Sequence, residues 1–236
     1  MIPAENPVIV ALDCSADEAI ALATSLRGRV RWLKVGMTLY YAQGPEIVGR
    51  LRELGFDVFV DLKLHDIPHQ VAGAAASIAK LGVGMFTVHA SGGSAMMRAA
   101  IEASRRAAEE TGNVAPAVLA VTVLTSCDDA GLSEVGIARS SAEQVVVLAR
   151  LAAESGVDGV VCSPQEAESV RSIFGPDALV VTPGVRPAWS ERGDQARIST
   201  PAEALSAGAS HLVIGRPITD APDPAEAAAR IASELT

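Results

Sequence analysis

Residues 57–71 of this 236-residue chain read DVFVDLKLHDIPHQV, and this stretch gives the clearest indication of the fold class. It opens as a buried strand, because the VFV run at 58–60 is β-branched and aromatic and follows Gly55 and Asp57. Charged residues then interrupt the apolar run, and Pro68 is suited to the first turn of a helix. A strand that passes directly into a helix predicts a parallel α/β fold, in which functional residues collect at the carboxyl ends of the strands.

Three charged residues follow this strand within six positions, namely Asp61, Lys63 and Asp66. Asp61 and Lys63 are two residues apart, so on a strand their side chains point to the same face. A single Asp–Lys pair is often only a structural ion pair. Three charges that follow an apolar strand so closely favour a functional site instead.

The composition is that of a folded protein with one large domain spanning residues 1–236. Hydrophobic residues make up 49% of the chain, which is enough for a sizeable core. The net charge of −9 and the aromatic content of 3% argue against nucleic-acid binding. No apolar run reaches membrane-spanning length, the first ten residues do not resemble a signal peptide, and the three cysteines form no CxxC pair. We expect a cytoplasmic protein without a membrane partner.

The same strand–helix alternation continues along the whole chain. Eight such units in 236 residues predict a single (β/α)8 barrel, known as a TIM barrel, whereas a doubly wound open sheet seldom needs eight. The expected strands cover 8–12, 32–35, 58–60, 85–89, 117–124, 159–162, 179–182 and 212–214. The expected helices cover 16–26, 45–54, 68–82, 93–111, 141–156, 164–174, 201–207 and 224–235.

In such a barrel the polar residues at the strand ends converge. Lys34 follows the neighbouring strand and can approach Asp61 and Lys63, so that each buried charge has an opposite neighbour. Gly215 and Arg216 follow the eighth strand, where barrels commonly bind phosphate. The converging residues are Asp13, Lys34, Asp61, Lys63, His89, Thr125, Ser126, Ser163, Arg186 and Arg216.

The histidines give only a weak metal signal. His65 and His69 are four apart, but Pro68 starts the helix between them, so they do not share a helix face. Lys63 also stands where a cation would lie between carboxylates. His89 fits a hydrogen-bonded core histidine better than a ligand. We expect no metal site.

The segment DLKLHDIP at 61–68 resembles the signature of the orotidine 5′-phosphate decarboxylase family. Further similar segments occur in the same order along the chain: VALD (10–13), LKVG (33–36), VHASGG (88–93), VTVLTS (121–126), TPGVRP (182–187), GDQ (193–195) and VIGRPI (213–218).

This resemblance implies decarboxylation of orotidine 5′-phosphate to uridine 5′-phosphate, without metal or cofactor, by a homodimer with shared active sites. It implies that Lys63 donates a proton to the pyrimidine carbon, held among Asp61, Lys34 and the partner subunit's Asp66. The other implied substrate contacts are Asp13 and Lys34 at the ribose, Ile67 and Gln70, Thr125 and Ser126 at the base, and Arg186, Gln195, Gly215 and Arg216 at the phosphate.

Two positions depart from the family pattern. Gln70 stands where threonine is common, and Cys127 replaces a frequent methionine. Three other functions remain compatible with the residues. They are a magnesium-dependent decarboxylase or aldolase of sugar phosphates with an Asp-x-Lys-x-x-Asp core, an aldolase that forms a Schiff base through Lys63, and a non-catalytic phosphate-ligand binding protein.

Overall fold

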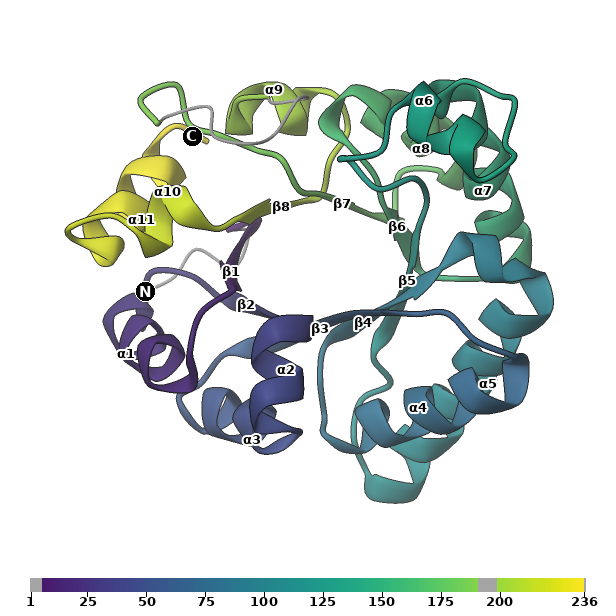
Figure 1. Cartoon of the computed structure of the whole chain (residues 1–236). Helices are drawn as coiled ribbons and strands as arrows, with labels where there is room; N and C mark the ends of the chain where they lie inside the picture. Colours follow the sequence, from purple (N-terminus) through teal and green to yellow (C-terminus); the bar gives the residue numbers. More distant parts are fainter. Residues whose placement is uncertain (1–5, 191–198, 236) are drawn as a thin grey trace.

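Eight parallel strands close into a barrel with helices on its outside (Figure 1). The computed structural model describes residues 6–190 and 199–235. Each strand pairs with the next in the chain, and β8 pairs with β1, which confirms the predicted (β/α)8 architecture. The strands are β1 Val8–Leu12, β2 Trp32–Gly36, β3 Asp57–Leu64, β4 Met85–His89, β5 Ala117–Val121, β6 Gly159–Val161, β7 Leu179–Thr182 and β8 His211–Ile214.

The helices surround the barrel in chain order (Figure 1). Two short 3-10 turns precede α5 and α8. The turns are η1 Ala90–Gly92 and η2 Pro164–Glu166. The helices are α1 Ala16–Leu26, α2 Met37–Gln43, α3 Glu46–Glu53, α4 Pro68–Lys80, α5 Gly93–Thr111, α6 Asp129–Glu134, α7 Ser141–Ser155, α8 Ala167–Phe174, α9 Pro201–Ser206, α10 Arg216–Thr219 and α11 Pro224–Ser233.

Capping residues set several helix starts. Ser15 caps α1 and Ser140 caps α7, each through a reciprocal pair of bonds with a glutamate three residues later. Pro68 is the first residue of α4, as predicted. Three short helices, α2, α6 and α10, lie in segments where none was predicted.

Alternation along the strands separates two cores. On β1, Val8, Val10 and Leu12 belong to the large cluster between the barrel and the helices, whereas Ile9 belongs to a small separate one. The small cluster fills the barrel and comprises the buried residues Ile9, Phe59, Met85, Leu119 and Val181. The same alternation turns Lys34, Asp61 and Thr87 inward, two positions beyond Trp32, Phe59 and Met85.

Strand β3 departs from the regular pattern beyond Val60. Its pairing with β4 runs from Val60 opposite Phe86 to Leu64 opposite Val88, so β3 advances four residues while β4 advances two. Lys63 lies within this irregularity with a φ of 52° and is the one non-glycine residue with positive φ among those described. This irregularity is a β-bulge. The bulge, rather than simple alternation along the strand, therefore determines where the Lys63 side chain points.

His211 begins β8 and packs edge-on against the Trp32 ring, with ring centroids 6.0 Å apart. Burial, helped by the charge of Arg31, lowers the pKa of His211 to about 4. Histidine in an unfolded chain has a pKa near 6.5, so below that pH the unfolded state binds the proton first. The stability of the fold with a neutral, buried His211 is therefore fully present above pH 6.5. Below that pH the free energy of unfolding decreases as the pH falls toward 4.

We predict that the free energy of unfolding falls less between pH 6.5 and pH 4 in His211→Gln than in the wild type, by up to about 3 kcal/mol. Urea unfolding of the wild type and the variant at several pH values measures this difference. The exposed His69→Gln is the matched control. Equal slopes for His211→Gln and the wild type would contradict the prediction.

Candidate active site

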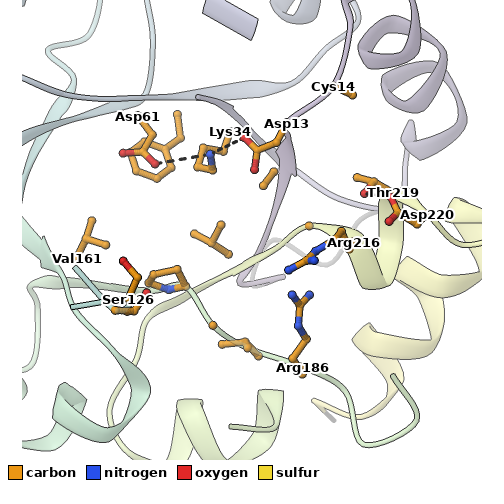
Figure 2. Close-up of a pocket in the computed structure, with 18 of the residues that line it drawn as sticks. Asp13, Cys14, Lys34, Asp61, Ser126, Val161, Arg186, Arg216, Thr219 and Asp220 are labelled. Carbon is orange, nitrogen blue, oxygen red and sulfur yellow. Dashed lines mark hydrogen bonds and ion pairs between the residues drawn. The ribbon is translucent and has the colours of Figure 1, made fainter. Parts of the chain in front are cut away.

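A cavity of about 800 Å³ opens at the carboxyl ends of the strands (Figure 2). Its lining combines inward-facing strand residues with the residues that directly follow the strands, as expected for this fold. It brings together nine of the predicted site residues, which are Asp13, Lys34, Asp61, Lys63, Thr125, Ser126, Arg186, Gly215 and Arg216.

Among the described residues, the other predicted site residues do not line this cavity. Asp66, Ile67 and Gln70 lie at the start of α4 with exposed side chains. The Asp66 carboxylate accepts a hydrogen bond from the backbone N–H of Ile67 at 2.6 Å. Gln195 lies outside the described residues.

Four charged side chains form a chain of ion pairs on one wall of the cavity. Lys63 Nζ donates to both Asp61 oxygens at 2.9 Å, and Lys34 Nζ lies 3.6 Å from Asp61 Oδ2. Lys34 also donates to Asp13 Oδ1 at 3.2 Å (Figure 2). The exposed fractions of the Asp13, Lys63, Asp61 and Lys34 side chains are 62%, 25%, 12% and 9%, so the most buried charges lie at the centre of the cluster.

Asp61 is the buried centre of this cluster. Burial alone would raise the pKa of its carboxyl group. The positive charges of Lys34 and Lys63, with hydrogen bonds from Lys63 and Thr87, outweigh burial and lower that pKa below its ordinary value. Asp61 is therefore ionised at neutral pH and holds the Lys63 ammonium in a fixed position.

Gly36 makes room for the ion pair between Asp13 and Lys34. A β-carbon at this position would lie 2.9 Å from Asp13 Oδ1 and 3.0 Å from Lys34 Nζ. Any larger residue would therefore push against the ion pair. Gly36 was not among the predicted site residues, although it ends the strand that carries Lys34.

The cavity floor is apolar. Phe59, Val121, Val161 and Val213 line it at inward-facing strand positions, and Cys14 is a further lining residue of the cavity. These residues can hold a flat, weakly polar ring, while Thr125 and Ser126 supply hydroxyl groups at the rim. Sequence reasoning missed the apolar positions, although the period-two pattern of each strand identifies them.

Arg186 and Arg216 lie away from the lysine cluster, with guanidinium groups that point toward one another (Figure 2). Arg186 is buried, with an exposed fraction of 8%, and follows Gly184, whose φ is 82°. Arg216 begins α10 directly after Gly215. Two converging guanidinium groups form a fork suited to a phosphate group.

His65 and His89 lie side by side, with ring centroids 5.4 Å apart. Burial lowers the pKa of His89, and the His65 and Lys63 charges lower it further. The buried Nδ1 of His89 makes no hydrogen bond within the described part of the chain, unlike the bonded core histidine expected. Within that part, no group of three or more His, Cys, Asp or Glu side chains could hold a metal ion.

The fold and the cavity define a (β/α)8-barrel protein with a lysine–carboxylate site and an arginine pair. Comparison with known proteins assigns the chain to one family. Residues 6–231 match the model of the "Orotidine 5'-phosphate decarboxylase / HUMPS family", and the chain belongs to this family.

Curated relatives and a solved structure agree with this assignment. A protein from Paramagnetospirillum magneticum named orotidine 5′-phosphate decarboxylase is 54% identical, over 98% of both chains. One of the same name from Moorella thermoacetica is 52% identical, over 98% of this chain and 93% of the relative. The crystal structure of orotidine 5′-phosphate decarboxylase from Lactobacillus acidophilus superposes with a TM-score of 0.86 at 41% identity, covering 98% of this chain and 99% of that one.

No helix among residues 6–190 and 199–235 has both the length and the apolar character needed to cross a membrane.

Proposed function

We propose that this chain decarboxylates orotidine 5′-phosphate to uridine 5′-phosphate and carbon dioxide, the last step of pyrimidine nucleotide synthesis. The observation that carries this proposal is the Lys63 ammonium, held 2.9 Å from both oxygens of Asp61 in a cavity that also contains Arg186 and Arg216. The family description joins two names, orotidine 5′-phosphate decarboxylase and HUMPS. Both curated relatives described above are named orotidine 5′-phosphate decarboxylase.

In this mechanism Lys63 is the proton donor. The bond between C6 of the pyrimidine and its carboxylate breaks, and the electron pair remains on C6. Lys63 Nζ gives a proton to that carbon, and the neutral amine then regains a proton from water. Asp61 holds the ammonium in place, and Lys34 on the other side of Asp61 holds that carboxylate, so that the three charges alternate.

Electrostatics at C6 cannot supply the whole rate enhancement. A fixed ammonium about 4 Å from the developing negative charge contributes roughly 4 kcal/mol at an effective dielectric constant near 20. Difficult reactions require a barrier reduction of up to about 20 kcal/mol. Binding of the distant phosphate must therefore contribute to positioning and to exclusion of water at the pyrimidine.

The remaining roles follow the arrangement of the cavity and the family resemblance. Asp13 and Lys34 contact the ribose hydroxyls, and Thr125 and Ser126 face the base above the apolar floor. The phosphate is held by Arg186, Gln195, Gly215 and Arg216.

We further propose a cytoplasmic homodimer in which Asp66, Ile67 and Gln70 complete the partner's site, and in which no metal or cofactor is needed. Asp66 is exposed and does not line the cavity of its own chain. Ile67 exposes 62% of its surface, which is unusual for a large apolar side chain and suits a surface covered by a partner.

A direct assay separates this function from its alternatives. Purified protein is mixed with orotidine 5′-phosphate and a chelator, and the change in pyrimidine absorbance is followed. Turnover in chelator supports the proposal. Activity that requires added magnesium would favour the sugar-phosphate enzymes, and binding without turnover would favour a non-catalytic binding protein.

We predict that Lys63→Ala lowers kcat by at least about 10³-fold, because the proton donor is lost. Uridine 5′-phosphate should still bind, since Lys63 acts mainly in the transition state. The surface variant Lys80→Ala is the matched control, because 52% of the Lys80 side chain is exposed. Turnover by Lys63→Ala within tenfold of the wild type would exclude Lys63 as the proton donor.

Arg216→Ala should lower kcat/KM for orotidine 5′-phosphate by roughly 30- to 900-fold, a loss of about 2–4 kcal/mol of transition-state stabilisation, because a charged donor to phosphate is removed. The effect should largely disappear with orotidine, which lacks the phosphate. The exposed Arg150→Ala is the control. An equal loss on both substrates would mean that Arg216 supports the fold.

Mixing two inactive homodimers, Lys63→Ala and Asp66→Asn, tests the shared site. After subunit exchange, half of the dimers are mixed, and each mixed dimer has one site with both residues intact. Roughly a quarter of all sites should therefore regain activity, as two-fold symmetry requires. If Asp66 served its own chain, every site would keep one defect and no activity would return.

A further inference from the structure

The backbone of Lys63 is held in an unfavourable conformation. Its φ of 52° lies in the left-handed region, which is unfavourable for a residue that carries a Cβ atom and a long side chain. The residue also lies in the irregular part of the β3–β4 pairing, between Val60 and Leu64. Such a conformation persists only where the surroundings determine it.

The side chain of Thr87, on β4, makes two hydrogen bonds to this segment. The backbone N–H of Lys63 donates to Thr87 Oγ1 at 2.8 Å, so it is satisfied within the bulge by a side chain. The Thr87 hydroxyl donates a hydrogen bond to Asp61 Oδ1 at 2.9 Å. The same carboxylate oxygen accepts from Lys63 Nζ at 2.9 Å.

These bonds close a ring that runs from the Lys63 backbone to the Thr87 hydroxyl, to the Asp61 carboxylate and back to the Lys63 ammonium. A hydroxyl has a single proton, so acceptance from Lys63 and donation to Asp61 fix its orientation. Thr87 has no exposed surface, so bulk water cannot take over its bonds. One hydroxyl thus connects both ends of Lys63.

We propose that Thr87 is a positioning residue for the reaction: it holds the left-handed backbone of Lys63 and the carboxylate of Asp61 so that the ammonium points at the reacting carbon. This inference rests on the proposed decarboxylation. Thr87 touches no substrate, because it does not line the cavity, and it acts only through Asp61 and Lys63.

The chemistry of Thr87 identifies the test variants. Thr87→Val keeps the shape and removes the hydroxyl, whereas Thr87→Ser keeps the hydroxyl and removes the methyl group. Thr182 is the matched control, because it is also a fully buried barrel threonine outside the cavity lining, and its hydroxyl bonds the His211 carbonyl at 3.4 Å. Each variant is assayed for kcat, for affinity toward uridine 5′-phosphate and for thermal unfolding.

Thr87→Val is expected to lower kcat about 100-fold, as a small misplacement of a reacting group does. Affinity for uridine 5′-phosphate should stay within threefold, Thr87→Ser should recover most of kcat, and Thr182→Val should leave kcat within threefold. Thr87→Ala relieves any steric problem of valine and should show the same loss if Thr87→Val does not fold.

Three results would overturn the inference. They are a kcat within threefold of the wild type for folded Thr87→Val or Thr87→Ala, an equal loss for Thr87→Ser, and a parallel loss of kcat and nucleotide affinity. Each leaves the proposed function intact as long as the wild type turns over orotidine 5′-phosphate. An inactive wild type would refute the proposed function itself.

Discussion

A nearly buried carboxylate between two ammonium groups is the interaction on which this site depends. Asp61 is 12% exposed and has Lys63 at 2.9 Å and Lys34 at 3.6 Å. Desolvating a carboxylate costs several kcal/mol, and the cost is offset only while both partners stay in place. The barrel provides that placement, because β2 and β3 are adjacent and Lys34 and Asp61 both occupy inward-facing positions near the strand ends. Removal of either lysine would leave a buried charge poorly compensated.

The cavity separates two tasks in space. The lysine–carboxylate wall concentrates charge on one side of the cavity, and the arginine pair follows β7 and β8 (Figure 2). Between them lies an apolar floor that includes Phe59 and Val161. An apolar floor lowers the local dielectric and so strengthens the field of Lys63. A substrate that spans both ends can use binding energy at its phosphate to place its ring against the lysine.

Much of this arrangement could be predicted from the sequence, because its determinants are local. The VIVAL run at 8–12 is β-branched and the Ser15–Glu18 capping box begins α1, so both elements have the predicted bounds. The pairing of Asp61 with Lys63 was also predicted, but for an incomplete reason. Regular alternation does not hold at 61–64, where the bulge depends on pairing with β4 and leaves no local signal. Helix α2 was missed because Gly36 at its start provides no side-chain cap.

The bulge explains why a lysine can adopt a conformation that glycine normally takes. On a regular strand, Lys63 would follow Asp61 along the barrel axis, about 7 Å further toward solvent. The two extra residues of β3 let the chain turn back instead, so that the ammonium lies against the carboxylate of Asp61. The backbone N–H that loses its strand partner is satisfied by Thr87. The cost of the left-handed conformation is therefore offset by the same contacts that place the ammonium, which links backbone strain at this position to the proposed chemistry.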